Sequence, residues 1–253
     1  SIAMYLEGFK RGRDLLSRYI QSGAHKPIIM ILGGRSRAGS RAAASHTASL
    51  VSDPRLIEDV SKQYGICCVN TLNELIDAAY AVPRLGPIRG RRICIVTNSG
   101  GPSVLATDYI ESAGFDISEL PLEVRQALSE ILPPMSSLRN PVDMTAEADY
   151  EKVFRTLVTL GTSEVCDALV FIYIPTASSL WREVARAVVD ARREYGLNMV
   201  VYVAGEGSEI MIKDFQNVGV AVVTSLEGIA SALRCAAIWM QGLRKAQRSQ
   251  LPS

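Results

Sequence analysis

The sequence predicts an α/β protein of two doubly wound units, each with a parallel sheet covered by helices on both faces. Short apolar runs, typical of buried strands, alternate along the chain with segments of helical spacing. Such alternation is typical of βαβ units. The segment Pro83-Arg-Leu-Gly-Pro87 interrupts it, and the alternation restarts beyond. We therefore expect one domain over residues 1–84 and a second over residues 85–253.

The first unit is expected to hold three strands, at residues 1–6, 27–32 and 65–69. Helices are expected at 9–22, from Pro54 to about 64, and at 71–82, while the stretch 33–50 between the second strand and Pro54 is expected to be a loop. Thr71, followed three residues later by Glu74, has the pattern of a capping box. Because Ser1 leads straight into a strand pattern, we expect a piece of a longer polypeptide whose first sheet is truncated at its N-terminus.

The second unit repeats the alternation with four or five strands. Apolar runs predict strands at 92–97, 168–174, 199–204 and 220–224, and a short one at 115–120. Helical spacing predicts helices at 102–113, 122–132, 147–161, 179–194, 208–217 and from 226 onward. Pro102 suits the first turn of its helix. The proline-rich segment 133–145 is expected to be an ordered loop.

The charge balance argues against two classes of protein. The net charge is +1, whereas a nucleic-acid-binding protein is expected to carry a basic surface. No apolar run approaches the roughly 18 residues that cross a bilayer, and no signal peptide is visible. We expect a cytoplasmic protein with neither nucleic acid nor a membrane as a partner.

Five cysteines are distributed over both units, at positions 67, 68, 94, 166 and 235. Their number is odd, no CxxC motif occurs, and three of them lie inside apolar strand-like runs. We therefore expect buried, reduced thiols and no metal site.

Ligands of doubly wound sheets bind beyond the carboxyl ends of the strands. Three turns at such ends suit anions: Tyr5-Leu-Glu-Gly8, the stretch 33–50 with Arg35, Arg37, Arg41 and His46, and Asn98-Ser-Gly-Gly101. Glycine lets an anion approach the backbone, and helix N-termini attract it through unpaired N–H groups. None of the turns holds a specific phosphate motif, so each taken singly is also explained as a tight connection.

Glu7 and His46 together suggest a reaction. Glu7 ends the first strand and His46 follows the neighbouring one, so both are expected on the same edge of the sheet. A neutral imidazole attacks phosphorus when a carboxylate holds its other nitrogen as a donor and stabilises the cation that forms. The pair predicts a phosphorylated His46.

Four segments carry a resemblance to a known family. They read YLEGFKRGRDLL (5–16), KPIIMILGGRSRAGSRAAASHTASL (26–50), RRICIVTNSGGPSVLATD (91–108) and RNPVDMT (139–145). In this order they resemble the nucleoside-diphosphate-forming acyl-CoA synthetases of the succinyl-CoA synthetase superfamily. The resemblance implies two flavodoxin-like ligase domains. It also implies a reaction in which acyl-CoA and phosphate give acyl phosphate and CoA, and the phosphoryl group moves to a histidine and on to ADP.

The resemblance also implies residue roles. His46 matches the phosphohistidine, and Glu7 matches the glutamate that orients it. Two helix N-termini are expected to cradle the phosphohistidine, with Gly8 in the first cradle and Asn98, Ser99, Gly100 and Gly101 in the second. The loop 140–143 matches a family signature and is interpreted as structural.

The resemblance further implies partners outside these residues. CoA, ADP or ATP, and Mg²⁺ are expected in the complete enzyme, on an upstream CoA-binding domain and on an ATP-grasp domain or beta subunit. The other expected partners are phosphate and a small acyl substrate, in an oligomer, and the isolated piece is expected to be inactive. Ala48 departs from the family, which has glycine there. Two alternatives remain open: a regulatory or CoA-sensing region of a protein acyltransferase, and a non-enzymatic module that binds an anion or a partner.

Overall fold

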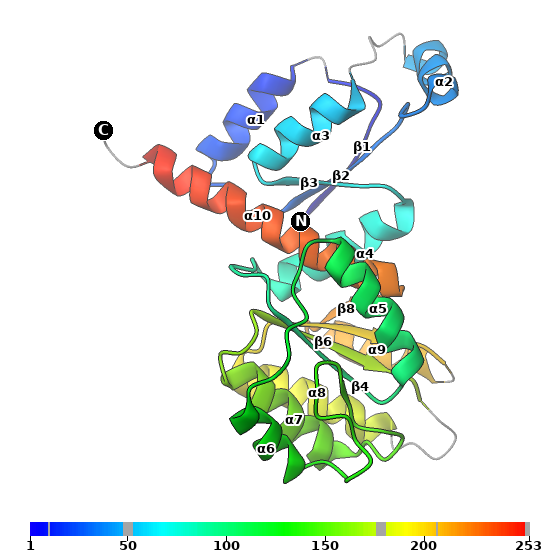
Figure 1. The fold of residues 1–253 in the computed structure, drawn as a ribbon. Helices are drawn as coiled ribbons and strands as arrows, with labels where there is room; N and C mark the ends of the chain where they lie inside the picture. Colours follow the sequence, from blue (N-terminus) through cyan, green and yellow to red (C-terminus); the bar gives the residue numbers. More distant parts are fainter. Residues whose placement is uncertain (10, 48–52, 176–180, 206, 251–253) are drawn as a thin grey trace.

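The computed structural model describes residues 1–9, 11–47, 53–175, 181–205 and 207–250 (Figure 1). Two parallel sheets organise it, one of three strands in the order β1-β2-β3 and one of five in the order β5-β4-β6-β7-β8. The prediction of two parallel-sheet α/β domains is confirmed. The placing of the domain boundary at residue 84 stays a prediction.

The strands are β1 (Ile2–Leu6), β2 (Ile28–Leu32), β3 (Ile66–Val69), β4 (Ile93–Thr97), β5 (Val142–Asp143), β6 (Ala168–Tyr173), β7 (Met199–Val203) and β8 (Ala221–Val223). The helices are α1 (Gly12–Gln21), α2 (Arg37–Thr47), α3 (Pro54–Gln63), α4 (Leu72–Leu85), α5 (Gly100–Ser112), α6 (Leu122–Ser129), α7 (Tyr150–Thr162), α8 (Trp181–Tyr195), α9 (Ser208–Asn217) and α10 (Leu226–Gln250).

The elements form stacked layers (Figure 1). Helices α1 and α3 cover the outer face of the first sheet, and α4, α5 and α10 fill the space between the sheets. The outer face of the second sheet is covered by α6, α7, α8 and α9. Strand β6 shows why helices cover both faces of the second sheet. Its Val170 and Ile172 face the middle layer, and its Phe171 and Tyr173 face the outer layer. A strand that is apolar at every position must be buried on both faces.

The middle layer belongs to both sheets. One apolar cluster joins Ile29 of β2 and Val69 of β3 to Val170 of β6, through side chains of α4 and α10. Asp77 of α4 is 2% exposed and accepts hydrogen bonds from the backbone N–H and the hydroxyl of Thr224, both at 2.9 Å. The two sheets therefore share the middle apolar cluster, while the outer face of each sheet has a cluster of its own.

The last helix approaches the first sheet very closely. The indole N–H of Trp239 donates to the carbonyl of Ala24 at 2.8 Å. A Cβ placed on Gly242 would lie 2.9 Å from the Cα of Gly65, so two glycines meet at this crossing. Only residues without side chains allow two backbones to come so close.

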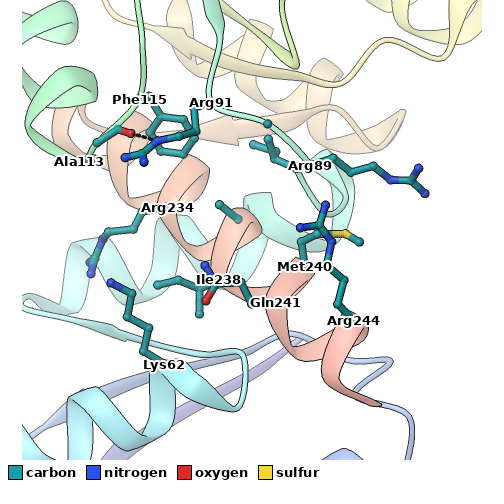
Figure 2. Close-up of a pocket in the computed structure, with 14 residues that line it drawn as sticks. Lys62, Arg89, Arg91, Ala113, Phe115, Arg234, Ile238, Met240, Gln241 and Arg244 are labelled. Carbon is teal, nitrogen blue, oxygen red and sulfur yellow. Dashed lines mark hydrogen bonds between the residues drawn. The ribbon is translucent and has the colours of Figure 1, made fainter. Parts of the chain in front are cut away.

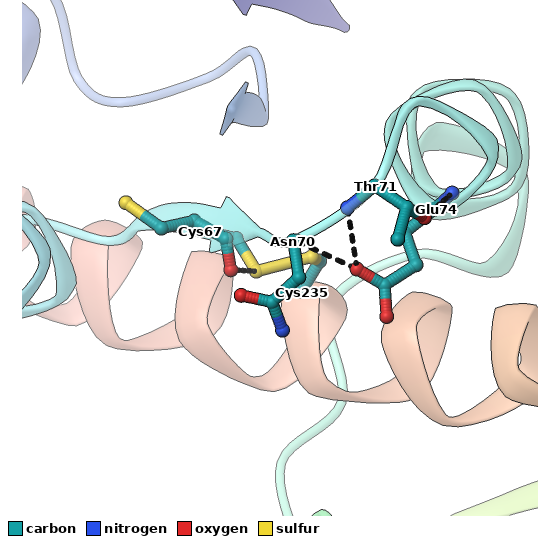
Figure 3. Close-up of a disulfide and its surroundings, with 6 residues drawn as sticks. Cys67, Asn70, Thr71, Glu74 and Cys235 are labelled. Atoms are coloured by element: carbon teal, nitrogen blue, oxygen red, sulfur yellow. Dashed lines mark hydrogen bonds between the residues drawn. A yellow bond between two sulfur atoms is a disulfide. The ribbon is translucent and has the colours of Figure 1, made fainter. Parts of the chain in front are cut away.

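One prediction about the cysteines is wrong. Cys67 of β3 and Cys235 of α10 form a disulfide, with Cα atoms 5.1 Å apart and a separation of 168 positions in the sequence (Figure 3). The predicted strand and helix are far apart in sequence, so spacing alone gave no sign that they pair. Figure 3 also shows the predicted capping box, in which the Thr71 hydroxyl accepts from the N–H of Glu74 at 3.1 Å and the Glu74 carboxylate accepts from the N–H of Thr71 at 3.2 Å.

Three further expectations differ from the structure. Residues 37–47 of the expected loop form α2, because alanine and arginine favour a helix and the Ser36 hydroxyl accepts from the N–H of Gly39 at 3.0 Å. The expected strand at 115–120 is reduced to a bridge between Arg92 and Asp116. Inside the expected loop 133–145 lies the short strand β5.

The second sheet has the strand order of a doubly wound fold with one reversal. Its strands run 2-1-3-4-5 when they are numbered within the unit, and the reversal lies between β4 and β6. In such folds the crevice beyond the carboxyl ends of these two strands receives the ligand. The turn Asn98–Gly101 leaves β4 at this point.

Candidate functional site: two edges that suit anions

The carboxyl ends of β1 and β2 bring Glu7 and Gly33 together. The N–H of Gly33 donates to the carbonyl of Leu6 at 2.8 Å, which continues the pairing of the two strands. A Cβ on Gly33 would lie 3.3 Å from the Cγ of Glu7 and 2.6 Å from the hydroxyl oxygen of Tyr5. Glycine therefore allows Glu7 to lie against the start of the segment that leads to His46.

Tyr5 orients the carboxylate of Glu7. Its hydroxyl donates to Oε1 of Glu7 at 3.0 Å. This hydrogen bond, followed by desolvation, raises the pKa of Tyr5 above its ordinary value. The sequence analysis missed Tyr5, although its spacing of two residues from Glu7 places both side chains on one face of the strand end.

Helix α2 carries His46 in its last turn. The side chain of His46 and the whole of Ala48 lie outside the described residues. What the structure gives is the place of the His46 backbone, in the helix that follows β2, beyond the same sheet edge as Glu7. The pairing of Glu7 with His46 stays a prediction.

The Arg35 side chain is held by protein groups. It forms an ion pair with Glu58 of α3, and its guanidinium donates to the side-chain oxygen of Asn70 at 2.5 Å. Arg35 therefore ties the stretch after β2 to α3 and to the end of β3. Arg37 and Arg41 are exposed on α2.

The first cradle is built differently from the expectation. Helix α1 begins at Gly12, with Arg11 at the N-cap position, and not at Gly8. Among the described residues, no side chain caps this N-terminus. A helix that began at Gly8 would have Glu7 as its N-cap, and glutamate is not among the usual N-cap types, which are Ser, Thr, Asp, Asn and Gly. Gly8 lies in the connection between β1 and α1.

The second cradle lies at the strand reversal of the second sheet. Asn98 is 9% exposed, and its side chain bridges β4 to the end of β6. Its amide nitrogen donates to the carbonyl of Ile174, and its oxygen accepts from the N–H of Ile174, both at 2.8 Å. The Asn98 side chain thus holds the two strand ends together, and the N–H of Ser99 donates to the Thr97 hydroxyl at 3.0 Å.

Ser99, Gly100 and Gly101 form the N-terminus of α5. Ser99 is the N-cap residue, and among the described residues its hydroxyl forms no capping hydrogen bond. A Cβ on Gly101 would meet no described atom within 4 Å, so the space beside it is open. A helix N-terminus with open space beside it suits an anion.

Asp143 is a neighbour of this N-terminus that the sequence analysis did not place in the site. One of its carboxylate oxygens lies 3.4 Å from the position of a Cβ on Gly100. Its other oxygen accepts from the N–H of Thr145 at 2.9 Å. The signal was the strand order, because pairing β5 with β4 brings Asp143 beside the end of β4.

Asn140 supports the structural interpretation of the loop 140–143, since its side chain forms hydrogen bonds with the backbone of Ile93 and Ile95.

The structure does not bring the two edges together. In Figure 1, α2 lies at the top right, whereas α5 starts where β4 ends, beside the second sheet in the lower half of the view. Glu7, Gly8 and the helix of His46 therefore form one group, and residues 98–101 with Asp143 form another.

The described part of the chain holds neither a group of three metal ligands nor a membrane-spanning helix. No three His, Cys, Asp or Glu side chains there come close enough to hold a metal ion. None of the helices there is long and apolar enough to cross a bilayer.

The fold defines a class: doubly wound α/β proteins, whose ligands bind beyond the carboxyl ends of the strands. Residues 1–82 match the family model described as the succinyl-CoA ligase like flavodoxin domain, and residues 93–233 match the ligase-CoA domain. The chain therefore belongs to the family of the ligase-CoA domain, whose model matches more than half of it.

Known relatives support the same family. The chain is 34% identical over 241 residues to the alpha subunit of ADP-forming acetate–CoA ligase II of Pyrococcus furiosus, covering 92% of this chain and 52% of the relative. It is 28% identical to the ADP-forming 4-hydroxybutyrate–CoA ligase of Nitrosopumilus maritimus, with 81% and 29% covered. The chain thus spans about half, or less, of the length of these relatives.

A solved structure has the same fold. It is the dinucleotide forming acetyl-coenzyme A synthetase 1 of Candidatus Korarchaeum cryptofilum in complex with phosphate and ADP. The TM-score is 0.86 at 29% identity, and the match covers 98% of this chain and 55% of that one.

Proposed function

We propose that this chain carries a phosphoryl group on His46 within an ADP-forming acyl-CoA synthetase. The observation that carries the proposal is one edge of the first sheet. Glu7 lies there at the end of β1, oriented by Tyr5 and packed against Gly33. The neighbouring strand β2 leads to α2, the helix that carries His46. The family relationship supports it, since relatives of the chain are ADP-forming CoA ligases.

The proposed chemistry takes place at phosphorus. Acyl-CoA and phosphate first give acyl phosphate and CoA. A nitrogen of His46 then attacks the phosphorus of the acyl phosphate, a P–N bond forms, and the P–O bond to the acyl group breaks as the carboxylate leaves with the electron pair. Glu7 accepts a hydrogen bond from the other ring nitrogen and so offsets the positive charge that develops on the ring. In the second half-reaction an ADP phosphate oxygen takes the phosphoryl group, which makes ATP, and all steps run in reverse.

The complete protein is proposed to supply what these residues lack. We assign CoA to an upstream CoA-binding domain, and ADP or ATP with Mg²⁺ to an ATP-grasp domain or a beta subunit, in an oligomer. Among the described residues no group of three metal-ligand side chains occurs, so the residues that hold Mg²⁺ are assigned to the nucleotide-binding domain or subunit. We accordingly expect no turnover from residues 1–253 alone.

The second edge is proposed to bind phosphate at the N-terminus of α5. Gly100 and Gly101 leave the backbone accessible, and Ser99 brings a hydroxyl whose oxygen and proton are available to a ligand. Asp143 adds a negative charge beside the first turn, which favours a protonated or metal-bound phosphate over a fully ionised one.

The test is phosphorylation of the complete protein with ATP, Mg²⁺ and its nucleotide-binding partner. We expect acid-labile, alkali-stable phosphate on the peptide that contains His46, and no label in His46→Ala. Glu7→Gln keeps the shape of the side chain and removes its charge, and should slow labelling about 10- to 100-fold, as expected for loss of a hydrogen bond to a charged group.

A matched control separates this role from a general effect of charge. Glu130→Gln removes a carboxylate at the exposed C-terminal end of α6, away from both edges, and should label at the normal rate. Equal rates for Glu7→Gln and wild type would disprove the assigned pairing. Absence of any label on His46, with an active partner present, would favour a regulatory or binding module.

A further inference from the structure

A basic pocket lies on the side of the molecule opposite the two edges. It has a volume of about 330 Å³ and is formed by the linker before β4, the C-terminal end of α5, the middle of α10 and the end of α3 (Figure 2). Since the linker enters β4 at its amino end and residues 98–101 leave it at its carboxyl end, the pocket and the second cradle lie at opposite ends of that strand.

Cationic side chains dominate the lining. There are five of them: Lys62, Arg89, Arg91, Arg234 and Arg244. In Figure 2, Lys62, Arg91 and Arg234 lie on one side and Arg89 and Arg244 on the other, with Ile238 and Gln241 between them. No Asp or Glu is among the lining residues of this pocket in the described part of the chain. Because the whole chain has a net charge of only +1, this gathering of positive charge is local.

Arg234 is the most informative of the five. It is half-buried in the middle of α10, where no helix C-terminus is available to offset its charge. Among the described residues, none forms an ion pair or a hydrogen bond with its guanidinium. Its positive charge is close enough to lower the pKa of the Cys68 thiol, against the larger opposing effect of burial. A half-buried guanidinium without a carboxylate partner keeps its N–H donors available to an anion.

The other cationic side chains of the pocket come from different elements, and one of them is held by a backbone carbonyl. Nε of Arg91 donates to the carbonyl of Gly114 at 2.5 Å, which fixes the guanidinium and engages one of its five N–H donors. The carboxylate behind the linker, Asp167, is bound by Arg92 at 3.1 Å and thus does not neutralise the pocket. Arg89 comes from the linker itself, and Lys62 lies in the last turn of α3.

The apolar part of the lining limits the choice of ligand. Ile88, Phe115 and Ile238 are 2%, 6% and 5% exposed and form its hydrophobic surface. Guanidinium groups bind phosphate oxygens in pairs, so cations on both sides of the pocket match an anion with more than one phosphate group. The volume lies within the range of small-molecule sites.

We propose that this pocket binds a small ligand that carries two or more linked phosphate groups, such as pyrophosphate or the diphosphate of a nucleotide. Contacts with Arg91 and Arg234 on one side and with Arg89 and Arg244 on the other would relieve the mutual repulsion of these cations. The site is separate from the proposed phosphohistidine reaction, and its occupancy does not depend on His46.

The experiment is equilibrium dialysis of the complete protein against radiolabelled pyrophosphate, in a background of His46→Ala that removes phosphoryl transfer. We expect a saturable pyrophosphate site, besides the proposed nucleotide and phosphate sites, whose affinity falls about tenfold or more in Arg234→Gln, and likewise in Arg89→Gln, which alters only the exposed linker. Arg155→Gln, which removes an exposed cation paired with Glu151 on α7, is the matched control and should bind normally.

Competition identifies the source of the diphosphate. Displacement of pyrophosphate from the Arg234-dependent site by ADP supports a nucleotide ligand, and failure of ADP to displace it supports an inorganic one. The proposal is overturned if pyrophosphate does not bind, or if it binds equally well to Arg234→Gln, Arg89→Gln and Arg155→Gln. It is also overturned if an acidic peptide binds there in an Arg234-dependent way and pyrophosphate does not.

Discussion

Asn98 and Ser99 are adjacent in sequence, yet the structure gives them opposite roles, and substitution separates these roles. Asn98→Ala removes two hydrogen bonds to the backbone of Ile174. The N–H and the carbonyl of Ile174 then lack those partners. Two hydrogen bonds at about 1 kcal/mol each, together with the cost of two half-buried backbone groups, give a loss of about 2–4 kcal/mol in the free energy of unfolding. Ser99→Ala removes a hydroxyl that forms no capping bond, so its effect on unfolding should stay within about 0.5 kcal/mol.

The assay combines urea unfolding, followed by circular dichroism, with the rate of phosphohistidine formation in the complete protein. Ser99→Ala should unfold like wild type and slow phosphoryl transfer about tenfold, as expected if its hydroxyl contacts the transferred group. Asn98→Ala should lose stability as well as transfer. Full stability of Asn98→Ala would refute the bridging role, and a normal transfer rate in Ser99→Ala would refute its contact with phosphate.

Three other substitutions test the shared core. Burial raises the pKa of Asp77, so the folded state holds the carboxyl proton to higher pH than the unfolded state does. The free energy of unfolding of wild type, relative to that of Asp77→Asn, should therefore fall as the pH rises above about 4. Urea titrations at a series of pH values measure this difference. Gly242→Ala places a methyl group 2.9 Å from the Cα of Gly65 and should cost about 1–3 kcal/mol in the free energy of unfolding, with a normal value contradicting the close approach. Cys235→Ser opens a disulfide that spans 168 residues and should cost about 2–5 kcal/mol; a reductant should lower the unfolding midpoint of wild type and leave that of the variant unchanged.

Local sequence signals predicted most of the fold. Runs such as residues 92–97 and 168–174 are apolar at almost every position, and only a strand buried on both faces accounts for that pattern. The capping box of Thr71 marked the start of α4 at the right residue. The end of α4 was missed, because Pro83 was interpreted as a helix breaker and lies instead in the last turn, with Gly86 at the C-cap. Its position near the end limits the disturbance, and the carbonyl of Ala79, which loses its helical partner at Pro83, accepts from the Ser1 hydroxyl at 2.6 Å.

Features that depend on distant parts of the chain could not be predicted. The pairing of Cys67 with Cys235 and the sharing of one core by both sheets require knowing how α10 lies, and no local pattern encodes this. The same holds for Asp143, which becomes a neighbour of the α5 N-terminus only through the strand order. The glutamate at the end of β1 could be placed on its sheet edge from sequence, because parallel strands end on the same side.

The position of α10 has a consequence for how the protein is made. A ribosome releases the three strands of the first sheet long before it releases Trp239, which bonds a residue 215 positions earlier. Until then β3, whose Val69 lies in the middle apolar cluster, lacks the helix α10 that packs against it, so the early part of a nascent chain exposes apolar surface suited to aggregation. Contacts so distant in sequence also form slowly. We infer that the first sheet completes its folding only after α10 has been synthesised. A product terminated before α10 is then a substrate for chaperones or proteases.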